Sequence, residues 1–355
     1  MSRANPLVSV IVPSYNSART LQACLQSVAD QTYAPLELIV VDDGSTDDTA
    51  QIARACGATV VSIPVNSGSA VARNVGAQNA KGEIFFYLDS DLGLDSRGVE
   101  VAVAMLRENP RIGAICGAYD PEPLLPPSLA ARYRLCEQYV WFNEIKIGPI
   151  PGLYTALFGI RAEVFREIGL FQAGLSYTED MDYGFRILQR YEIWVTTAIH
   201  GRHDHDATLR MVLSKVFHRT YDGMQLWMRY RSLPGGAATA ARATAAVTMF
   251  AALLALPLPW LLGPLAALVS PLLLVTTVAL DTKMYRHAFA SGGLWFGLFF
   301  SVMRLLVTAT TGVAAAAGVL LYLLSRRPDE RRPAVAADSA STGAPTAVHT
   351  HRSGS

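Results

Sequence analysis

The sequence has few charged residues, few cysteines and no excess of charge of either sign. Lys and Arg number 30 against 29 Asp and Glu, so the formal net charge is +1. Binding to a nucleic-acid backbone needs a concentrated positive surface, so this balance argues against nucleic acid as a partner. The 4 cysteines lie far apart without a CxxC pair, which argues against a zinc site or a redox motif. We expect them to be small core residues in a reducing compartment.

Two nucleotide-binding motifs are also missing. No GxGxxG follows the first apolar run, and no GxxxxGK[ST] occurs anywhere. Their absence argues against a dinucleotide-binding Rossmann fold and against a P-loop NTPase. Residues 1–7 lack the apolar stretch of a cleavable signal peptide, so we expect the globular part to stay in the cytoplasm.

Charged residues make up 17% of the chain, and this low share has a local cause. Residues 243–280 contain no charged residue, and residues 288–325 contain only Arg304. Long apolar runs are typical of membrane helices, so we predict a membrane region over residues 236–325 with two to three hydrophobic helices. This prediction makes the lipid bilayer a partner of the protein.

The first apolar run is too long for one span and carries prolines and glycines in its middle. It therefore predicts a helical hairpin with spans near 241–261 and 264–280. Residues 293–325 are a third segment, interpreted as an interfacial helix followed by a short span. Positive residues favour the cytoplasmic side for Arg242 and for the loop 281–287. A third crossing would place the Arg-rich end outside, against the same rule, so the number of spans stays open.

Residues 1–235 are predicted to form one cytoplasmic α/β domain, and the Ala-, Ser-, Thr- and Pro-rich residues 326–355 a disordered tail. Short Val- and Ile-rich runs, apolar on both faces, predict buried parallel strands at 8–12, 36–41, 59–63, 84–88 and 112–116. Helical patterns lie at 18–28, 48–55, 69–80, 96–108, 128–142 and 180–191. Alternation of this kind predicts a doubly wound, mostly parallel sheet.

Polar residues follow three of these strands, at 13–16, 42–45 and 89–91. Ligands of open parallel sheets bind beyond the carboxyl ends of the strands, so the three clusters predict one site. Asp and Ser at strand ends are often helix caps, but that reading does not cover Asp89 and Asp91, which flank one residue. Like charges this close need a neutralising partner, and a hard divalent ion such as Mg²⁺ or Mn²⁺ suits oxygen ligands.

Phosphate groups at such a site would need basic side chains. Arg73 lies on the helix predicted after the third strand and is the candidate. The alternative is an ordinary solvated helix arginine, which composition alone favours.

Four segments together resemble family 2 glycosyltransferases, which have the GT-A fold. They are VSVIVPSYN at 8–16, VVDDGSTD at 40–47, the run from Asn66 to Asn74, and LDSD at 88–91. The resemblance covers about residues 7–191. It implies a nucleotide-sugar donor and a site made of Pro13, Tyr15, Asp42, Asp43, Arg73, Asp89 and Ser90 around the nucleotide, with Asp91 on the metal.

A later segment, TEDMDYGFR at 178–186, resembles the acidic segment of the same family. The resemblance implies that Asp180 is the general base of an inverting reaction. Acids at a helix start are also favourable partners of the helix dipole, a reading that suits Glu179 and Asp182. His205 is preferred over His203 as a further metal ligand, against the alternative of a surface histidine cluster.

These features predict an enzyme: a membrane-anchored inverting glycosyltransferase that moves one sugar from a nucleotide-diphosphate sugar, UDP-linked, to a lipid-linked or cell-envelope glycan. A metal neutralises the leaving diphosphate, and Asp180 takes the proton of the acceptor hydroxyl. No Gln-x-x-Arg-Trp segment of processive synthases follows, which favours transfer of single sugars. The expected location is the inner cell membrane, multi-pass, with the catalytic domain in the cytoplasm.

Two alternatives stay open from the sequence. A polyprenyl-phosphate glycosyltransferase would use an acceptor phosphate, which is already a nucleophile and needs no base. A non-catalytic membrane component would bind the nucleotide sugar without turnover.

Overall fold

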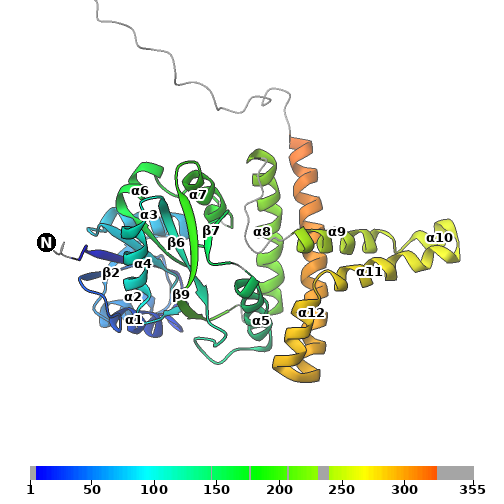
Figure 1. Ribbon diagram of the computed structural model, residues 1–355, viewed down its shortest axis with the longest axis horizontal. Helices are drawn as coiled ribbons and strands as arrows, with labels where there is room; N and C mark the ends of the chain where they lie inside the picture. The colour runs from blue at the N-terminus through cyan, green and yellow to red at the C-terminus, as the bar shows by residue number, and fades with distance from the viewer. Residues whose placement is uncertain (1–4, 145, 176, 206–207, 231–239, 326–355) are drawn as a thin grey trace, which may run out of the picture.

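The computed structural model describes residues 5–144, 146–175, 177–205, 208–230 and 240–325. The tail predicted for residues 326–355 lies outside them. Figure 1 shows a sheet domain in the blue to green part of the chain, followed by a layer of helices and a projecting hairpin.

The first half of the sheet is parallel, as predicted. The strands β1 (Val8–Ser14), β2 (Leu36–Asp43), β3 (Thr59–Ile63) and β4 (Ile84–Leu88) lie in the order β3-β2-β1-β4. Every neighbouring pair among them is parallel. The carboxyl ends of β2, β1 and β4 therefore lie side by side.

The second half of the sheet is mixed. Strand β8 (Leu157–Arg161) runs antiparallel between β4 and β6 (Ile112–Tyr119). Strand β9 (Glu192–His203) pairs in parallel with β6 and antiparallel with β5 (Leu92–Leu94) and β7 (Gly148–Ile150). The run at 112–116 is thus a strand, as predicted, and it forms part of β6. Strand β8 separates it from the parallel half of the sheet.

Strand β3 corrects one detail of the prediction. It lies at the end of the strand order, and Thr59 and Ser62 are exposed, so it is not buried on both faces. An edge strand has a neighbour on one side only, and its polar residues face water.

Helices cover both faces of the sheet, as a doubly wound fold requires. They are α1 (Leu21–Ala29), α2 (Thr49–Ala55), α3 (Ser69–Asn79), α4 (Gly98–Glu108), α6 (Ala162–Ile168) and α7 (Glu179–Leu188). Alternate residues of β1 face the two sides: Val10 packs in the cluster of α1 and α4, and Ile11 in the cluster of α3, α6 and α7. The period of two in side-chain direction divides the core into these two halves.

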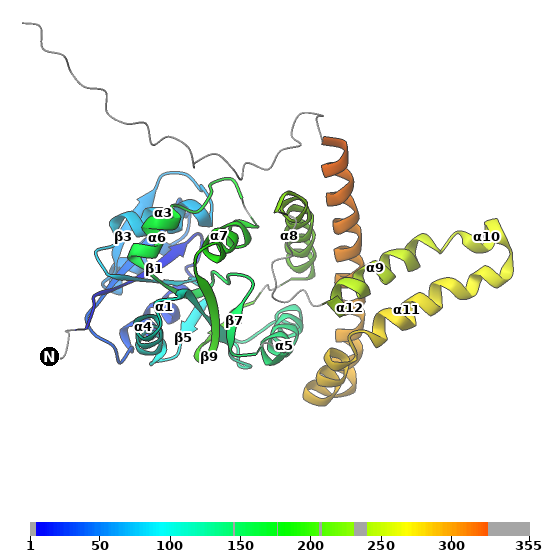
Figure 2. The ribbon, with the colours of Figure 1, turned by 45° about the horizontal axis from the view of Figure 1, so that its top comes forward.

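Three further helices form a layer beside the sheet domain (Figures 1 and 2): α5 (Leu129–Glu144), α8 (Leu209–Tyr230) and α12 (Thr282–Ser325). They share one apolar cluster, in which Tyr133, Val212 and Met303 are buried together. The long helix α12 is interrupted at Gly293, whose φ of 72° is not helical.

Between α8 and α12 the chain forms the predicted hairpin. Its arms are α9 (Ala240–Leu254) with α10 (Leu258–Leu262), and the 3₁₀ helix η1 (Pro264–Leu268) with α11 (Val269–Ala279). Among the described residues, α12 alone is long and apolar enough to cross a membrane. The arms of the hairpin are apolar but shorter than the predicted spans.

The single charge of the last apolar segment has a structural explanation. Arg304 is buried and donates to Glu137 of α5 at 2.6 Å and to Asp281 at 2.5 Å. A buried charge needs such partners. Arg304 therefore joins α12 to α5 rather than marking a break between two segments.

Candidate active site

The loops after β1 and β2 are tied together at the carboxyl edge of the sheet. The amide of Asn16 donates to Ser45 Oγ at 2.9 Å, and the amide of Thr46 donates to Asn16 Oδ1 at 2.8 Å. Asn16 has a φ of 49°, a left-handed conformation that Asn tolerates better than most residues. Pro13 is buried within β1, and Tyr15 is 49% exposed at the rim.

The last two residues of β2, Asp42 and Asp43, hold the backbone of nearby loops in place. Both oxygens of Asp43 accept hydrogen bonds at 2.8 Å, from the amides of Ser67 and Gly68. Asp42 accepts from the amide of Ser45 at 3.1 Å. Asp43 thus sets the start of α3, where Gly68 has a φ of 91°.

Arg73 is buried between two acidic segments and is not the solvated arginine of the alternative interpretation. Its Nη2 donates to Asp89 Oδ1 at 3.0 Å, and its Nη1 donates to Glu179 Oε1 at 3.1 Å. Glu179 also accepts from Ser69 Oγ at 2.7 Å. Gly76, one turn on, allows α3 to approach β1, since a Cβ there would lie 2.3 Å from Ile11 Cγ2. Arg73 therefore connects the end of β4 to the start of α7.

The Arg73 guanidinium also affects the pKa of Asp89, the residue that follows β4. Burial raises the pKa of the Asp89 carboxyl, and the opposing attraction of Arg73 lowers it without cancelling the rise. Ser90, the next residue, lies with its Oγ 2.7 Å from Ser17 Oγ, which joins this loop to the one after β1.

Asp91 faces the end of β9. Its Oδ1 lies 3.5 Å from His203 Nε2, and its carbonyl accepts from the amide of Asp204 at 2.9 Å. The His203 and His205 rings are 4.2 Å apart, centroid to centroid. The prediction of His205 as metal ligand stays a prediction, and the structure places His203 next to Asp91.

The donor set at this position fits a divalent ion. His205 Nε2 is buried and has no hydrogen-bond partner within the part of the chain that the structure describes. Burial lowers the pKa of His205, and the positive neighbours His203 and Arg134 lower it further, so its imidazole is neutral and can bind a metal. No group of three acidic, His or Cys side chains among the described residues is arranged to hold a metal. A divalent ion here would be held by the Asp91 carboxylate and a neighbouring imidazole, and Mg²⁺ and Mn²⁺ are hard ions that take oxygen ligands.

Asp180 lies in the first turn of α7 and is buried. Its Oδ1 accepts from the amide of Met181 at 2.8 Å, and its Oδ2 pairs with Arg219 of α8. Burial raises the pKa of the Asp180 carboxyl, and Arg219 opposes that rise. The Arg219 side chain is 58% exposed, so it covers the acid from the solvent side.

Arg219 is a residue that sequence reasoning missed. It lies on an amphipathic helix outside the recognised motifs, and no spacing links it to Asp180, 39 positions earlier. Glu179 was read as a dipole partner, whereas the structure gives it a specific bond to Arg73. Asp182, in the same first turn of α7, pairs with Arg186 one turn later and accepts a hydrogen bond from the Tyr230 hydroxyl at 2.9 Å.

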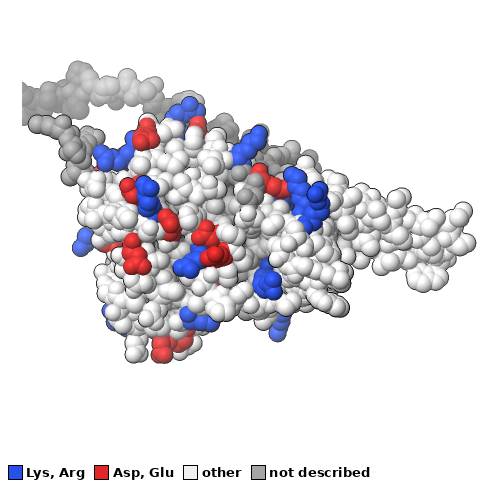
Figure 3. Space-filling view, turned by 60° about the horizontal axis from the view of Figure 1, so that its bottom comes forward, with Lys and Arg blue, Asp and Glu red and all other residues white. Residues whose placement is uncertain are grey.

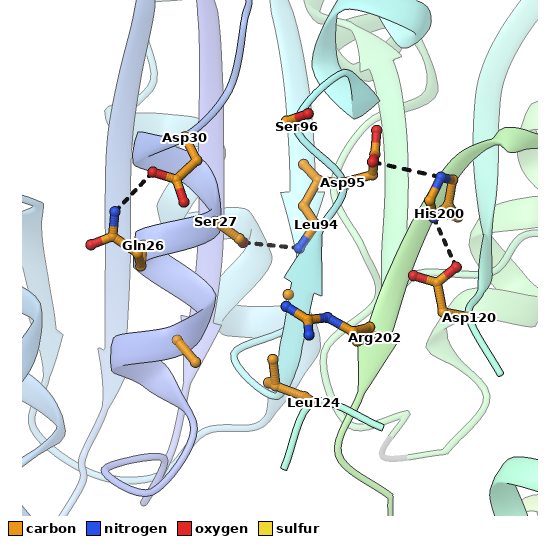
Figure 4. Close-up of a pocket in the computed structure, with 12 residues that line it drawn as sticks. Gln26, Ser27, Asp30, Leu94, Asp95, Ser96, Asp120, Leu124, His200 and Arg202 are labelled. Carbon is orange, nitrogen blue, oxygen red and sulfur yellow. Dashed lines mark hydrogen bonds and ion pairs between the residues drawn. The ribbon is translucent and has the colours of Figure 1, made fainter. Parts of the chain in front are cut away.

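The predicted residues therefore gather at one edge of the sheet. Contacts run from Asp89 through Arg73 to Glu179, whose neighbour is Asp180. A separate cavity of about 440 Å³ lies between α1, β5 and β9 and contains none of these residues (Figure 4). Its polar lining includes His200, 2.8 Å from Asp120.

Comparison with known proteins identifies the family. The model of glycosyl transferase family 2 matches residues 9–169. An uncharacterised glycosyltransferase of Rickettsia typhi is 31% identical over 209 residues, which cover 55% of this chain and 65% of that protein. A putative teichuronic acid biosynthesis glycosyltransferase of Bacillus subtilis is 43% identical over 96 residues, 26% of this chain and 38% of that protein.

A solved structure has a similar fold. It is a mannosyltransferase from Pyrobaculum calidifontis in complex with GDP-Man and Mn²⁺, with a TM-score of 0.54 and 19% identity. The superposition covers 91% of this chain and 88% of that one. The matched motifs, the relatives and this likeness of fold agree with the geometry described above: residues 9–169 form a glycosyl transferase family 2 domain with the GT-A fold, and the chain spans 65% of the length of the Rickettsia typhi relative.

Proposed function

We propose that the protein is a membrane-anchored, metal-dependent inverting glycosyltransferase that moves one sugar from a nucleotide-diphosphate sugar to a lipid-linked or cell-envelope glycan. The observation that carries this proposal is the buried Asp180 beside the contact chain of Asp89, Arg73 and Glu179. The Bacillus subtilis relative, named for teichuronic acid biosynthesis, supports an envelope acceptor. The Pyrobaculum calidifontis mannosyltransferase, solved with GDP-Man and Mn²⁺, supports a nucleotide-sugar donor and a divalent ion.

The proposed reaction is a single displacement at the anomeric carbon. The acceptor oxygen forms the new bond while the bond from the anomeric carbon to the diphosphate breaks, and the acceptor proton goes to Asp180 Oδ2. A divalent ion held by Asp91 and a neighbouring histidine would neutralise charge on the leaving diphosphate. Arg219 occupies Asp180 Oδ2 and must turn outward first, which its exposure allows.

The experiment is a nucleoside-diphosphate release assay with full-length protein in membranes, on a panel of UDP-, GDP- and dTDP-sugars with Mn²⁺ or Mg²⁺. Asp180→Asn should lower turnover by about 10²–10⁴-fold, the usual contribution of a positioned base. Asp91→Ala should abolish release, as should a chelator. Asp30→Asn is the matched control, because Asp30 caps α1 away from the site. Donor binding without release for any acceptor would favour the non-catalytic alternative.

A second function, transfer to a polyprenyl phosphate, is favoured by the pairing of Asp180 with Arg219. A phosphate acceptor needs no base, and a guanidinium is a good partner for its charge. Full release activity in Asp180→Asn, with loss in Arg219→Gln, would support this reaction over transfer to a hydroxyl group.

A further inference from the structure

The hairpin of α9 and α11 presents an apolar surface without charge. Residues 243–280 contain no Lys, Arg, Asp or Glu, and the space-filling view shows the projecting arm entirely white (Figure 3). Its end is the most exposed part, with Trp260 85% and Leu265 83% exposed. Water is a poor solvent for such a surface, and a bilayer core is a good one.

Charged residues gather at the base of the hairpin. Arg242 at the start of α9 donates to Glu144 of α5 at 2.6 Å, and Asp281 after α11 accepts from Arg304. Lys283 follows and is 82% exposed. This change from charged base to apolar arm places the membrane surface at the base.

The end of the hairpin is too apolar to emerge on the far side. The arm of α9 and α10, residues 240–262, is at most about 34 Å long at ~1.5 Å per residue, which brings its turn near the far edge of a hydrocarbon core of about 30 Å. A crossing hairpin would place Leu256, Trp260 and Leu265 in water on the other side.

The backbone of the turn is suited to a medium without water. Three residues of the turn, Pro257, Pro259 and Pro264, have no N–H group. The amides that bond to carbonyls of the turn or of the preceding arm include those of Ala255, Leu256, Leu258, Trp260, Gly263 and Ala266. Unpaired amides are costly in hydrocarbon, so this pairing points to lipid around the turn.

Helix α12 extends across the hairpin and along α8, as Figures 1 and 2 both show. Contact with α8 continues from the cluster of Val212 and Met303 to Tyr322, whose hydroxyl donates to the Met228 carbonyl at 3.4 Å. Four exposed basic residues of α8 lie along this length: Arg210, Lys215, Arg219 and Arg229. If α12 crossed the bilayer, α8 would lie in the hydrocarbon core beside it, and so would these charged side chains.

Between residues 295 and 320, the exposed residues of α12 lie on one face. Six apolar residues recur there at helical spacing and are 41–83% exposed: Trp295, Leu298, Val302, Leu306, Val313 and Leu320. The opposite face packs on α5 and α8 through Phe300, Met303 and Val307. A helix with one exposed apolar face, whose opposite face is covered by α5 and α8, suits the plane of a membrane surface.

We propose that the protein binds the bilayer from one side: α12 lies along the membrane surface, and the hairpin enters the bilayer as a re-entrant loop that does not emerge. This replaces the predicted multi-pass topology and rests on the membrane attachment in the proposed function. The chain end after Ser325 then stays on the side of the catalytic domain. That arrangement removes the conflict between the Arg-rich end and the positive-inside rule.

Labelling with a membrane-impermeant maleimide in sealed vesicles tests the side of each segment. Cys56 is exposed on the catalytic domain and marks its side, whereas Cys24, Cys116 and Cys136 are buried. In a Cys56→Ser background, Ser341→Cys should react from the same side as Cys56. Leu262→Cys should react from neither side and only after detergent is added.

The outcomes separate the topology from the attachment. Reaction of Leu262→Cys from the side opposite Cys56 would show that the hairpin crosses, and reaction of Ser341→Cys from that side would show that α12 crosses. Either result overturns the proposal. Release of the protein by a carbonate wash would instead overturn membrane attachment and with it that part of the proposed function.

Depth measurements give a second, independent test. Nitroxide labels at Leu298, Val302, Val313 and Leu320 should lie at the same depth in vesicles of mixed zwitterionic and anionic lipid. A crossing helix would change depth by about 33 Å from the first label to the last, at ~1.5 Å per residue. A steady gradient along these labels would contradict the proposal.

Discussion

At the residue scale, Arg73 joins the two acidic segments of the site. It is buried and bonded to Asp89 and Glu179, so its removal leaves carboxylates without their cation. Breaking a buried ion pair by removing one partner costs about 3–5 kcal/mol. We therefore expect Arg73→Gln to lower the free energy of unfolding by that amount in urea titrations. Arg97→Gln, which breaks an exposed pair with Glu100, should cost under ~1 kcal/mol. Equal effects of the two changes would contradict this assignment.

Arg219 provides a pH-dependent prediction at the same scale. A general base works in its deprotonated form, so activity should fall as the pH drops through the pKa of Asp180. Burial raises that pKa and Arg219 lowers it. Loss of the cation in Arg219→Gln should therefore raise the pKa and move the acidic limb of the kcat/KM profile to higher pH. Arg219→Lys, which keeps the charge, should leave the limb near its wild-type position. An unmoved limb in Arg219→Gln would show that another group titrates.

The site residues were predictable where local sequence determines their position. Strand ends can be read from apolar runs, so Asp42, Asp89 and Asp91 could be placed at one edge of the sheet before the structure was known. Arg219 could not be placed, because its approach to Asp180 depends on how α8 packs against the sheet domain. Its helix repeats apolar residues as any amphipathic helix does, and that pattern carries no information about which polar residue faces the acid.

At the scale of elements, the parallel half of the sheet followed from its pattern, and the mixed half did not. Strand β8 enters between β4 and β6 from far along the chain, and pairing of such distant segments is not encoded in local periodicity. The hairpin was predictable because prolines and glycines interrupt an uncharged run. The topology proposed for α12 was not, because composition alone does not distinguish a crossing helix from one that lies along a membrane surface.

The contact between α8 and α12 yields a prediction about one glycine. A Cβ at Gly318 would lie 2.6 Å from the Tyr221 carbonyl oxygen and 3.0 Å from Met224 Cβ. Gly→Ala normally stabilises a helix interior by about 1 kcal/mol. We expect Gly318→Ala to destabilise instead, by about 1–3 kcal/mol, because the two helices must separate. Thermal unfolding in detergent would measure this. Gly159→Ala is the comparison, since its added methyl would meet neighbours at 3.5 Å, and a milder effect at Gly318 than at Gly159 would contradict the close packing.

At the scale of the whole molecule, helices on both sides of the boundary predicted at residue 235 share one apolar cluster. Buried residues of α5 and α8, including Tyr133 and Val212, have their partners in α12. A chain cut after residue 235 would expose this cluster to water. We expect it to self-associate in size-exclusion chromatography and to bind a hydrophobic dye, unlike the full chain in detergent. A monodisperse fragment without dye binding would show that the sheet domain folds without α12.

The position of α8 has a thermodynamic consequence. One of its side chains pairs with Asp180, and its backbone lies against Gly318 of α12. Under the proposed membrane attachment, a ligand that displaces Arg219 and shifts α8 would change the free energy with which α12 rests on lipid. Reciprocity then requires lipid to change the affinity for that ligand by the same factor. Acceptor binding and membrane adsorption are in that case a single coupled equilibrium, and an affinity measured in detergent would differ from the affinity at a bilayer by the size of this coupling.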